Sequence, residues 1–333
     1  MSYNRSVAGI PLAIAAGLTL PLQARINGEL GHQLADPLLA GLFSFTGAAL
    51  VMSIATLALP SGRAGFVELV AGTRRGTIPW YFCAAGLVGA YFIFAQTSFV
   101  PGVGLALYTV AVVTGQTISG LAVDRIGLGP AGKRAITLLR VLGGFLMVGA
   151  VFWAVSPRLA AVADPAGMLI PLALIALAGV LMSFQHAMNG RIAVQVRSPV
   201  PGTLMNYVVG SVAIALIWGL KLAFTGGLPT LPPEPFLYVG GVLGCINLIL
   251  SALLIRRIGV LLTGLGMIAG QLIGALLMDW LVPVAGSAVY PQTVVGTFLT
   301  LAAIVVAALP ASTLRRFRRR GSEPLRVHQD LPH

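Results

Sequence analysis

The stretch LQARINGELG (Leu22–Gly31) returns 162 residues later as FQHAMNGRIA (Phe184–Ala193), and this echo indicates a duplicated fold. Each copy lies where an apolar run gives way to polar residues, and each carries Gln, three further residues and then Asn-Gly. Residues four apart share one face of a helix. The sequence therefore presents the same pair of polar amides twice, near the ends of two apolar segments.

The composition identifies the solvent that surrounds these segments. Only 9% of the residues are charged, 57% are hydrophobic, and the mean hydropathy is +0.93. A soluble globular domain carries about 25% charged residues. A membrane-spanning helix needs roughly 20 mostly apolar residues, whereas a membrane barrel shows alternating strands of about 10 residues. The apolar runs are long and do not alternate, so we expect an all-α integral membrane protein.

Ten apolar runs are separated by Pro, Gly and polar residues, and the first is interpreted as a retained helix, not as a cleaved signal peptide. They cover about 7–24, 38–59, 79–99, 103–122, 136–155, 169–188, 202–224, 236–255, 260–280 and 291–310.

The basic residues predict the orientation of these ten helices. With the N-terminus in the cytoplasm, 18 of the 21 Lys and Arg residues fall on the cytoplasmic side and three fall outside. Short cytoplasmic loops are rich in Lys and Arg. We therefore expect both termini in the cytoplasm. The positive charge of the last residues predicts contacts with anionic lipid head groups and not with nucleic acid.

A second echo shows how far the duplication extends. TGQTISGLAVD (Thr114–Asp124) returns as AGQLIGALLMD (Ala269–Asp279), 155 residues later. One unit of five helices is thus repeated, and an odd number of spans inverts the second copy. The expected organisation is a first repeat over 1–160, an inverted repeat over 161–312, and a disordered basic tail over 313–333. Inverted repeats are typical of secondary transporters, whose substrate sites lie near the midplane between the repeats.

These motifs resemble the YdcZ-type (DUF606) branch of the drug/metabolite transporter superfamily, which includes EamA-like proteins. The resemblance rests on the two Gln-x-x-x-Asn-Gly segments, on Gly-Gln followed by Asp, and on the doubled five-helix unit, over about residues 8–310. It implies a multi-pass protein of the bacterial inner membrane that works by alternating access. Some members of that branch are single five-helix units that pair, so a homodimer stays open.

Neutral polar residues within or beside the apolar runs are the candidates for the substrate path. An amide offers hydrogen bonds in the membrane at a lower cost than a charge. An equally open alternative is that these amides only join neighbouring helices. The candidates are Gln23, Asn27, Gln116, Gln185, Asn189, Asn206, Asn247 and Gln271.

Four charged residues are the candidates for gating or for proton coupling: Glu29, Asp124, Asp279 and Arg140. The acids lie near predicted helix ends, where they could also cap a helix or pair with Arg. Their peripheral position weakens a simple proton-antiport mechanism.

Transport of a small molecule is the leading prediction, with H⁺ or Na⁺ as the coupling ion. The alternative is a membrane scaffold, an accessory subunit or a lipid-handling protein. An enzyme is not expected, because no nucleophile with its acid and base partners can be assembled from four His and two separate Cys. No P-loop, cofactor site or metal site is recognised in the sequence.

Overall fold

The computed structural model describes residues 2–129, 132–133, 138–161, 165–282 and 290–308, and within these ranges every regular element is a helix. The elements are α1 (Ser2–Gly17), α2 (Thr19–Gln33), α3 (Pro37–Ala58), α4 (Pro60–Arg74), α5 (Trp80–Cys83), α6 (Gly86–Val103), α7 (Leu105–Ile126), α8 (Leu138–Ala161), α9 (Pro165–Gln195), α10 (Val200–Thr225), the 3₁₀ helix η1 (Pro235–Tyr238), α11 (Gly240–Leu281) and α12 (Pro291–Ala308).

Five segments of the described chain are long and apolar enough to cross a membrane. They are Pro37–Ala58, Trp80–Val103, Leu105–Ile126, Gly167–Gln195 and Val200–Thr225. Shorter apolar helices cover Val141–Ala154, Gly240–Leu250 and Gly266–Leu281. The all-helical membrane class expected from the composition is therefore confirmed.

The first predicted span, over about 7–24, corresponds to two helices, α1 and α2, which together extend beyond the predicted end. The chain turns at Leu18, between α1 and α2, and α2 then continues to Gln33. Asn27-Gly28 lies inside α2, and Asn189-Gly190 lies inside α9. The predicted apolar runs, which ended at about 24 and 188, were therefore too short here. A single glycine costs a helix only about 1 kcal/mol, so each helix continues through its Asn-Gly pair.

The eighth and ninth predicted helices form one assigned helix, α11, of 42 residues. A straight helix of that length spans roughly 63 Å, about twice the hydrocarbon thickness. However, Gly240 lies against Asn27 and Asp279 pairs with Arg25, so both ends of α11 reach the same part of α2. The two halves of α11 therefore run in opposite directions, as two separate spans would.

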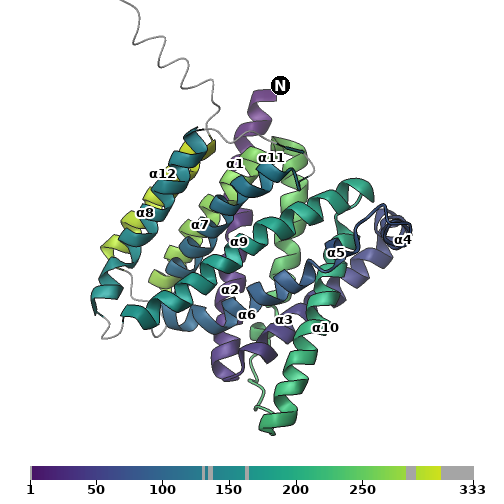
Figure 1. The fold of residues 1–333 in the computed structure, drawn as a ribbon, viewed down its shortest axis with the longest axis horizontal. Coiled ribbons are helices and arrows are strands. Elements are labelled where there is room, and N and C mark those ends of the chain that lie inside the picture. The colour runs from purple at the N-terminus through teal and green to yellow at the C-terminus, as the bar shows by residue number, and fades with distance from the viewer. Residues whose placement is uncertain (1, 130–131, 134–137, 162–164, 283–289, 309–333) are drawn as a thin grey trace, which may run out of the picture.

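Helices from the two halves of the chain pack in matched pairs. α8 packs along α12, and Figure 1 shows this pair side by side at one edge of the molecule. Further close pairs are α3 with α10, α7 with α9, and α1 with α11. The core is consequently made of contacts between distant parts of the sequence, including the buried side chains Leu105, Ile175 and Leu272.

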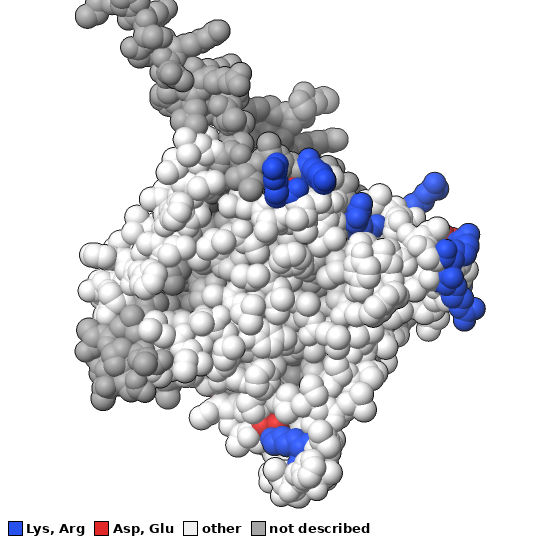
Figure 2. Space-filling model, viewed as in Figure 1, with Lys and Arg blue, Asp and Glu red and all other residues white. Residues whose placement is uncertain are grey.

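An additional helix, α4, lies between α3 and α5, where the sequence predicted only a loop. Figure 2 shows Lys and Arg side chains near the N-terminal end of the molecule and over the α4 region, while one small charged group lies at the opposite end. The broad surface between them carries no charge on the face drawn. This distribution is that of a protein whose middle contacts lipid.

Candidate transport site

Two helix crossings of the core are built from glycines at equivalent places in the two halves. A Cβ on Gly17 of α1 would meet the Met267 carbonyl and lie 2.9 Å from the Cα of Gly270 in α11. The other crossing joins α7 and α9, where a Cβ on Gly179 would meet the Val112 carbonyl and one on Gly115 would lie 3.0 Å from the nitrogen of Val180. Gly17 and Gly179 are 162 residues apart, and Gly115 and Gly270 are 155 apart, which are the offsets of the sequence echoes.

The glutamines of the two echoes lie in matching surroundings. The Gln23 amide nitrogen lies 3.1 Å from the Cβ position of Gly244, and the Gln185 amide nitrogen lies 3.0 Å from that of Gly89. Gln185 also donates a hydrogen bond to the carbonyl of Ala85 at 3.0 Å, where α6 begins. Both glutamine side chains are buried. Each glycine thus leaves room for an amide between two helices.

An aromatic pair joins these two glutamine sites. Phe45 of α3 and Tyr207 of α10 make an edge-to-face contact with ring centroids 5.2 Å apart. Phe45 approaches Gly89 beside Gln185, whereas the Tyr207 hydroxyl approaches Gly244 beside Gln23. Phe45 and Tyr207 are themselves 162 residues apart. The arrangement therefore places one of the two related glutamines near each ring of this aromatic pair.

In the part of the chain that the structure describes, three buried side-chain oxygens of asparagine residues have no hydrogen-bond partner. The Asn27 amide donates to Gln96 Oε1 at 2.8 Å, yet its own oxygen has no hydrogen-bond partner. The side-chain oxygens of Asn189 and Asn206 are likewise buried and unpaired. An unsatisfied buried polar atom is costly and calls for an explanation. A bound solute or water could supply the missing donors.

The remaining path candidates are mainly engaged with other helices or half-buried. Asn247 donates to Thr19 Oγ1 at 2.9 Å and to the Ala16 carbonyl at 3.2 Å. Gln116 and Gln271 are half-buried, and the Gln116 carbonyl accepts a hydrogen bond from Ser183 at 2.7 Å. Interhelical hydrogen bonds of this kind contribute about 0.6–2 kcal/mol each.

Among the charged candidates, Asp279 is the one that the structure places at a helix junction. Its two carboxylate oxygens accept hydrogen bonds from the backbone N–H groups of Leu105 at 3.0 Å and Ala106 at 2.7 Å, at the start of α7. Arg25 lies 3.9 Å from the same carboxylate and also donates to the Val282 carbonyl. A carboxylate is favourable at a helix N-terminus. Asp279 therefore ties α11, α7 and α2 together.

A second charged contact joins the α2–α3 corner to the end of α10. Asp36 caps α3 through Leu39 N at 3.2 Å and accepts hydrogen bonds from Lys221 and from the Trp218 indole, each at 2.9 Å. Burial alone raises the pKa of Asp36, but these three donors outweigh it and hold the pKa below the usual range of an aspartate. The contact borders an open cavity of about 340 Å³ lined by the end of α10 and residues 225–229.

The other charged candidates are not brought to these contacts. Glu29 is half-buried on α2 and accepts a hydrogen bond from Gln33 at 2.9 Å. Asp124 is half-buried near the end of α7. Arg140 lies on α8, but its side chain is outside the described residues. Among the described residues, no cluster of His, Cys, Asp and Glu could hold a metal ion.

Sequence reasoning missed Arg25, Asp36, Lys221 and the central pair of Phe45 and Tyr207. Asp36 could have been found, since Asp before Pro is a common start of a helix. Arg25 was counted only as an external basic residue, and its partner is 254 positions away. No local pattern identifies such a partner, nor the contact between Phe45 and Tyr207.

The chain matches a family model described as "Putative inner membrane exporter, YdcZ" over residues 8–153 and 170–306. A curated relative, the inner membrane protein YdcZ of Escherichia coli (strain K12), is 34% identical over 122 residues. The aligned part covers 36% of this chain and 76% of the relative, so the relative is about half as long as this chain.

Proposed function

The chain belongs to the YdcZ family of inner-membrane proteins, and on that premise we propose that it is a secondary transporter that moves a small molecule by alternating access. In this proposal ten spans form two inverted repeats, over 1–160 and 161–312, with both termini in the cytoplasm. The observation that carries it is the matched packing of the two halves. A family relative of about half the length supports a doubled unit.

The matched packing supports two structurally related halves, because several close contacts occur twice with their partners exchanged; the inversion itself follows from the odd number of spans in each predicted repeat. Gly17 of the first half crosses Gly270 of the second, and Gly179 of the second half crosses the stretch around Gly115 of the first. Likewise, Gly86 lies against the Asn206 carbonyl, and Gly241 lies against the carbonyl of Ser44. Two halves related by an axis between them produce this exchange. Transporters of inverted repeats use it to present one site to either side.

The two ion pairs supply the gate at one end of the molecule, which the positive-inside pattern assigns to the outside. Both pairs join the first half to the second: Arg25 to Asp279, and Lys221 to Asp36. At the equivalent places of the other half, Arg25 corresponds to Ala187 and Asp36 to Ser198. In this proposal the charged gate is confined to one end, and the two ion pairs hold that end closed when they are formed.

The substrate path runs between the two glutamine sites and the unpaired asparagine oxygens. Gln23, Gln185 and Asn206 are buried, while Asn189 is half-buried. Rocking of the halves would open this interior to either side in turn, and the glycine crossings allow helices to move while closely packed. Asp279 and Asp36 are the acids that a coupling proton would reach from outside, and Glu29 and Asp124 are secondary candidates. If Na⁺ is the coupling ion, it would be coordinated by the same carboxylates or by the side-chain amide oxygens.

Binding is tested by the thermal stability of the purified protein across a panel of metabolites and toxic compounds. A ligand at 100 times its Kd stabilises a protein by about 2.7 kcal/mol. We expect a stabilising compound whose effect is lost in the Asn27→Ala, Asn189→Ala double variant and kept in Thr46→Ala, an exposed position on α3. The same compound should be carried into or out of proteoliposomes. Stabilisation that survives the double variant would remove these asparagines from the path.

A scaffold or accessory subunit is the second candidate. Its supporting observation is that Asn27, Gln185 and Asn247 all make hydrogen bonds between helices. A scaffold would show no stabilising compound and no flux, but would co-purify with a partner in constant ratio. A homodimer remains a proposal under either function.

A further inference from the structure

We propose that α4 is an interfacial helix whose arginines hold the phosphate groups of anionic phospholipids. The proposal concerns a surface outside the transport path and does not depend on the substrate. It rests on how the faces of α4 are divided, on the aromatic side chains beside it, and on the charges around it.

One face of α4 is used to attach it to the rest of the protein. Gly62, Gly65, Leu69 and Gly72 are buried at helical spacing. A Cβ on Gly65 would lie 3.1 Å from Pro201 and 3.2 Å from Ser198, so this face rests on the start of α10. Leu69 packs in the same cluster as Ile192 and Val196 at the end of α9. The position of α4 on the molecule is therefore fixed by close packing.

The exposed part of α4 has two flanks of different chemistry. Helical spacing places Phe66, Val67 and Val70 on one flank together with Arg63 and Arg74. Val67 is 67% exposed and Phe66 is 36% exposed. A flank that combines apolar side chains with arginine is typical of a helix lying in a membrane interface. The long arginine side chains can cover apolar surface while their charges reach the phosphate layer.

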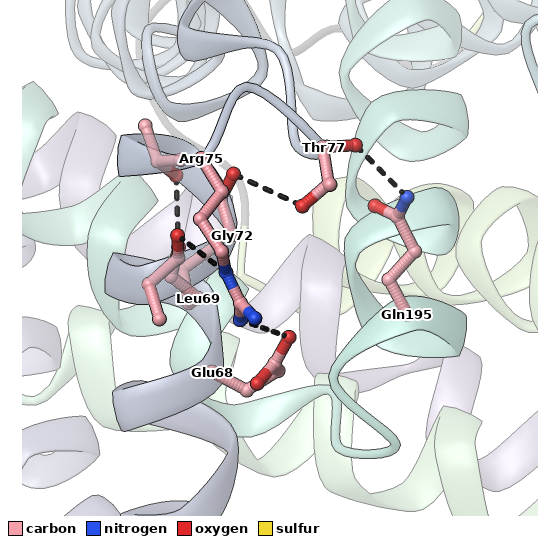
Figure 3. A network of polar contacts seen from close by, with 8 residues as sticks. Glu68, Leu69, Gly72, Arg75, Thr77 and Gln195 are labelled. Atoms are coloured by element: carbon pink, nitrogen blue, oxygen red, sulfur yellow. Dashed lines mark hydrogen bonds and ion pairs between the residues drawn. The ribbon is translucent and has the colours of Figure 1, made fainter.

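The opposite flank carries the polar side chains. Glu68 and Arg75 form an exposed ion pair with N and O 3.0 Å apart. Figure 3 shows this pair beside the bend at Thr77, where the Thr77 hydroxyl donates to the Gly72 carbonyl and Gln195 of α9 donates to the Thr77 carbonyl. Arg75 therefore has a partner within the protein, whereas Arg63 and Arg74 are on the flank with the exposed apolar side chains.

Aromatic side chains and further arginines extend the same surface. Trp80 is 73% exposed and Tyr81 is 50% exposed, directly after the bend that follows α4. Trp and Tyr are enriched at membrane interfaces. Arg197 is exposed between Val196 and Ser198, the two residues that Gly65 approaches. Figure 2 shows the basic side chains gathered over this region, and their positive charge is complementary to anionic head groups.

The test compares phosphatidylglycerol with phosphatidylcholine, each added to the delipidated protein in detergent, with bound lipid counted by native mass spectrometry. Wild type should retain phosphatidylglycerol in preference. Each Lys or Arg near an anionic surface contributes a constant increment, so the Arg63→Gln, Arg74→Gln double variant should bind it about 30-fold more weakly. Arg75→Gln removes one charge from the other flank of the same helix and should change binding by less than about 3-fold.

The proposal is overturned if phosphatidylcholine binds equally well, or if Arg75→Gln weakens phosphatidylglycerol binding as much as the Arg63→Gln, Arg74→Gln double variant does. A second measurement keeps all arginines and tests the placement of the helix. Ser61 is exposed and lies seven residues before Glu68, on the polar flank. A spin label at Val67→Cys should contact oxygen dissolved in lipid, and a label at Ser61→Cys should contact a water-soluble nickel reagent. A label at Val67 that meets the water-soluble reagent as readily as one at Ser61 would exclude an interfacial helix.

Discussion

At the scale of single residues, buried amide side chains join neighbouring helices through one polar atom and, in Asn27, leave the other polar atom without a partner. Asn27 holds α2 to α6 through Gln96, yet its carbonyl oxygen is left over in the interior. Gln185 likewise holds α9 to the start of α6 while lying beside Phe45. Their burial and amide chemistry were predictable from two apolar runs that carry the same pattern. Their partners were not, because each partner belongs to a helix far along the chain.

Removal of the Asp279 carboxylate should be among the most destabilising single changes. Asp279→Ala leaves Arg25 buried without its counter-charge and leaves two N–H groups of α7 without acceptors. Breaking a buried ion pair costs about 3–5 kcal/mol. Thermal unfolding in detergent should show this loss, with a smaller loss for Asp279→Asn because one amide oxygen can still accept from α7. Equal losses in the two variants would contradict the capping role.

The Asp36 contact should give the folded state a component of stability that depends on pH. Because the folded pKa is depressed, the stabilisation is present at neutral pH and is lost as the pH falls below about 4 through the folded pKa. Unfolding midpoints measured from pH 7 to pH 3 should fall less steeply in Asp36→Asn than in wild type. Parallel curves would show that this carboxylate does not contribute to the pH dependence.

At the scale of helices, the sequence predicts the positions of the elements better than it predicts the partners of single side chains. Apolar length predicts the spans that the structure describes as long apolar helices, and the echo of glycines and polar residues predicts their division into two sets of five. The α4 helix was missed because its mixed composition, with Arg63 and Glu68 among small residues, has no apolar run. The break at Leu18 was missed as well, since no Pro or Gly pair marks it beyond Gly17.

Replacing a glycine at either helix crossing with alanine should destabilise the protein, in the first half and in the second half alike. Gly17→Ala and Gly179→Ala would each push a Cβ into a facing carbonyl, of Met267 and Val112 respectively. Overpacking typically costs about 1–3 kcal/mol, so each variant should unfold at a lower temperature. Gly219→Ala is the matched control on α10, where nothing lies within 4 Å. A destabilised control, or a neutral change at either crossing, would argue against close crossings there.

At the scale of the whole molecule, the two halves are joined differently at their two ends. The end that we assign to the outside has two ion pairs between the halves, whereas the α4 end has the exposed hydrogen bond from Gln195 to Thr77 and close apolar packing. The helices themselves pack in matched pairs between the two halves, so this difference lies in the side chains and not in the helix arrangement. In the proposed alternating-access mechanism, the ion pairs would favour closure of the outer end, while the paired helices would permit closure of either end.

The most direct test of alternating access between two inverted halves is pulsed EPR on two spin-label pairs, with and without the outer ion pairs. One pair reports on the Asp36 end, through Gln33→Cys and Leu228→Cys, and the other on the α4 end, through Glu68→Cys and Val194→Cys, all at exposed positions. In the Asp36→Asn, Asp279→Asn background, the account predicts a longer component at the Asp36 end and no lengthening at the α4 end. Unchanged distances at both ends, or lengthening at both together, would contradict it.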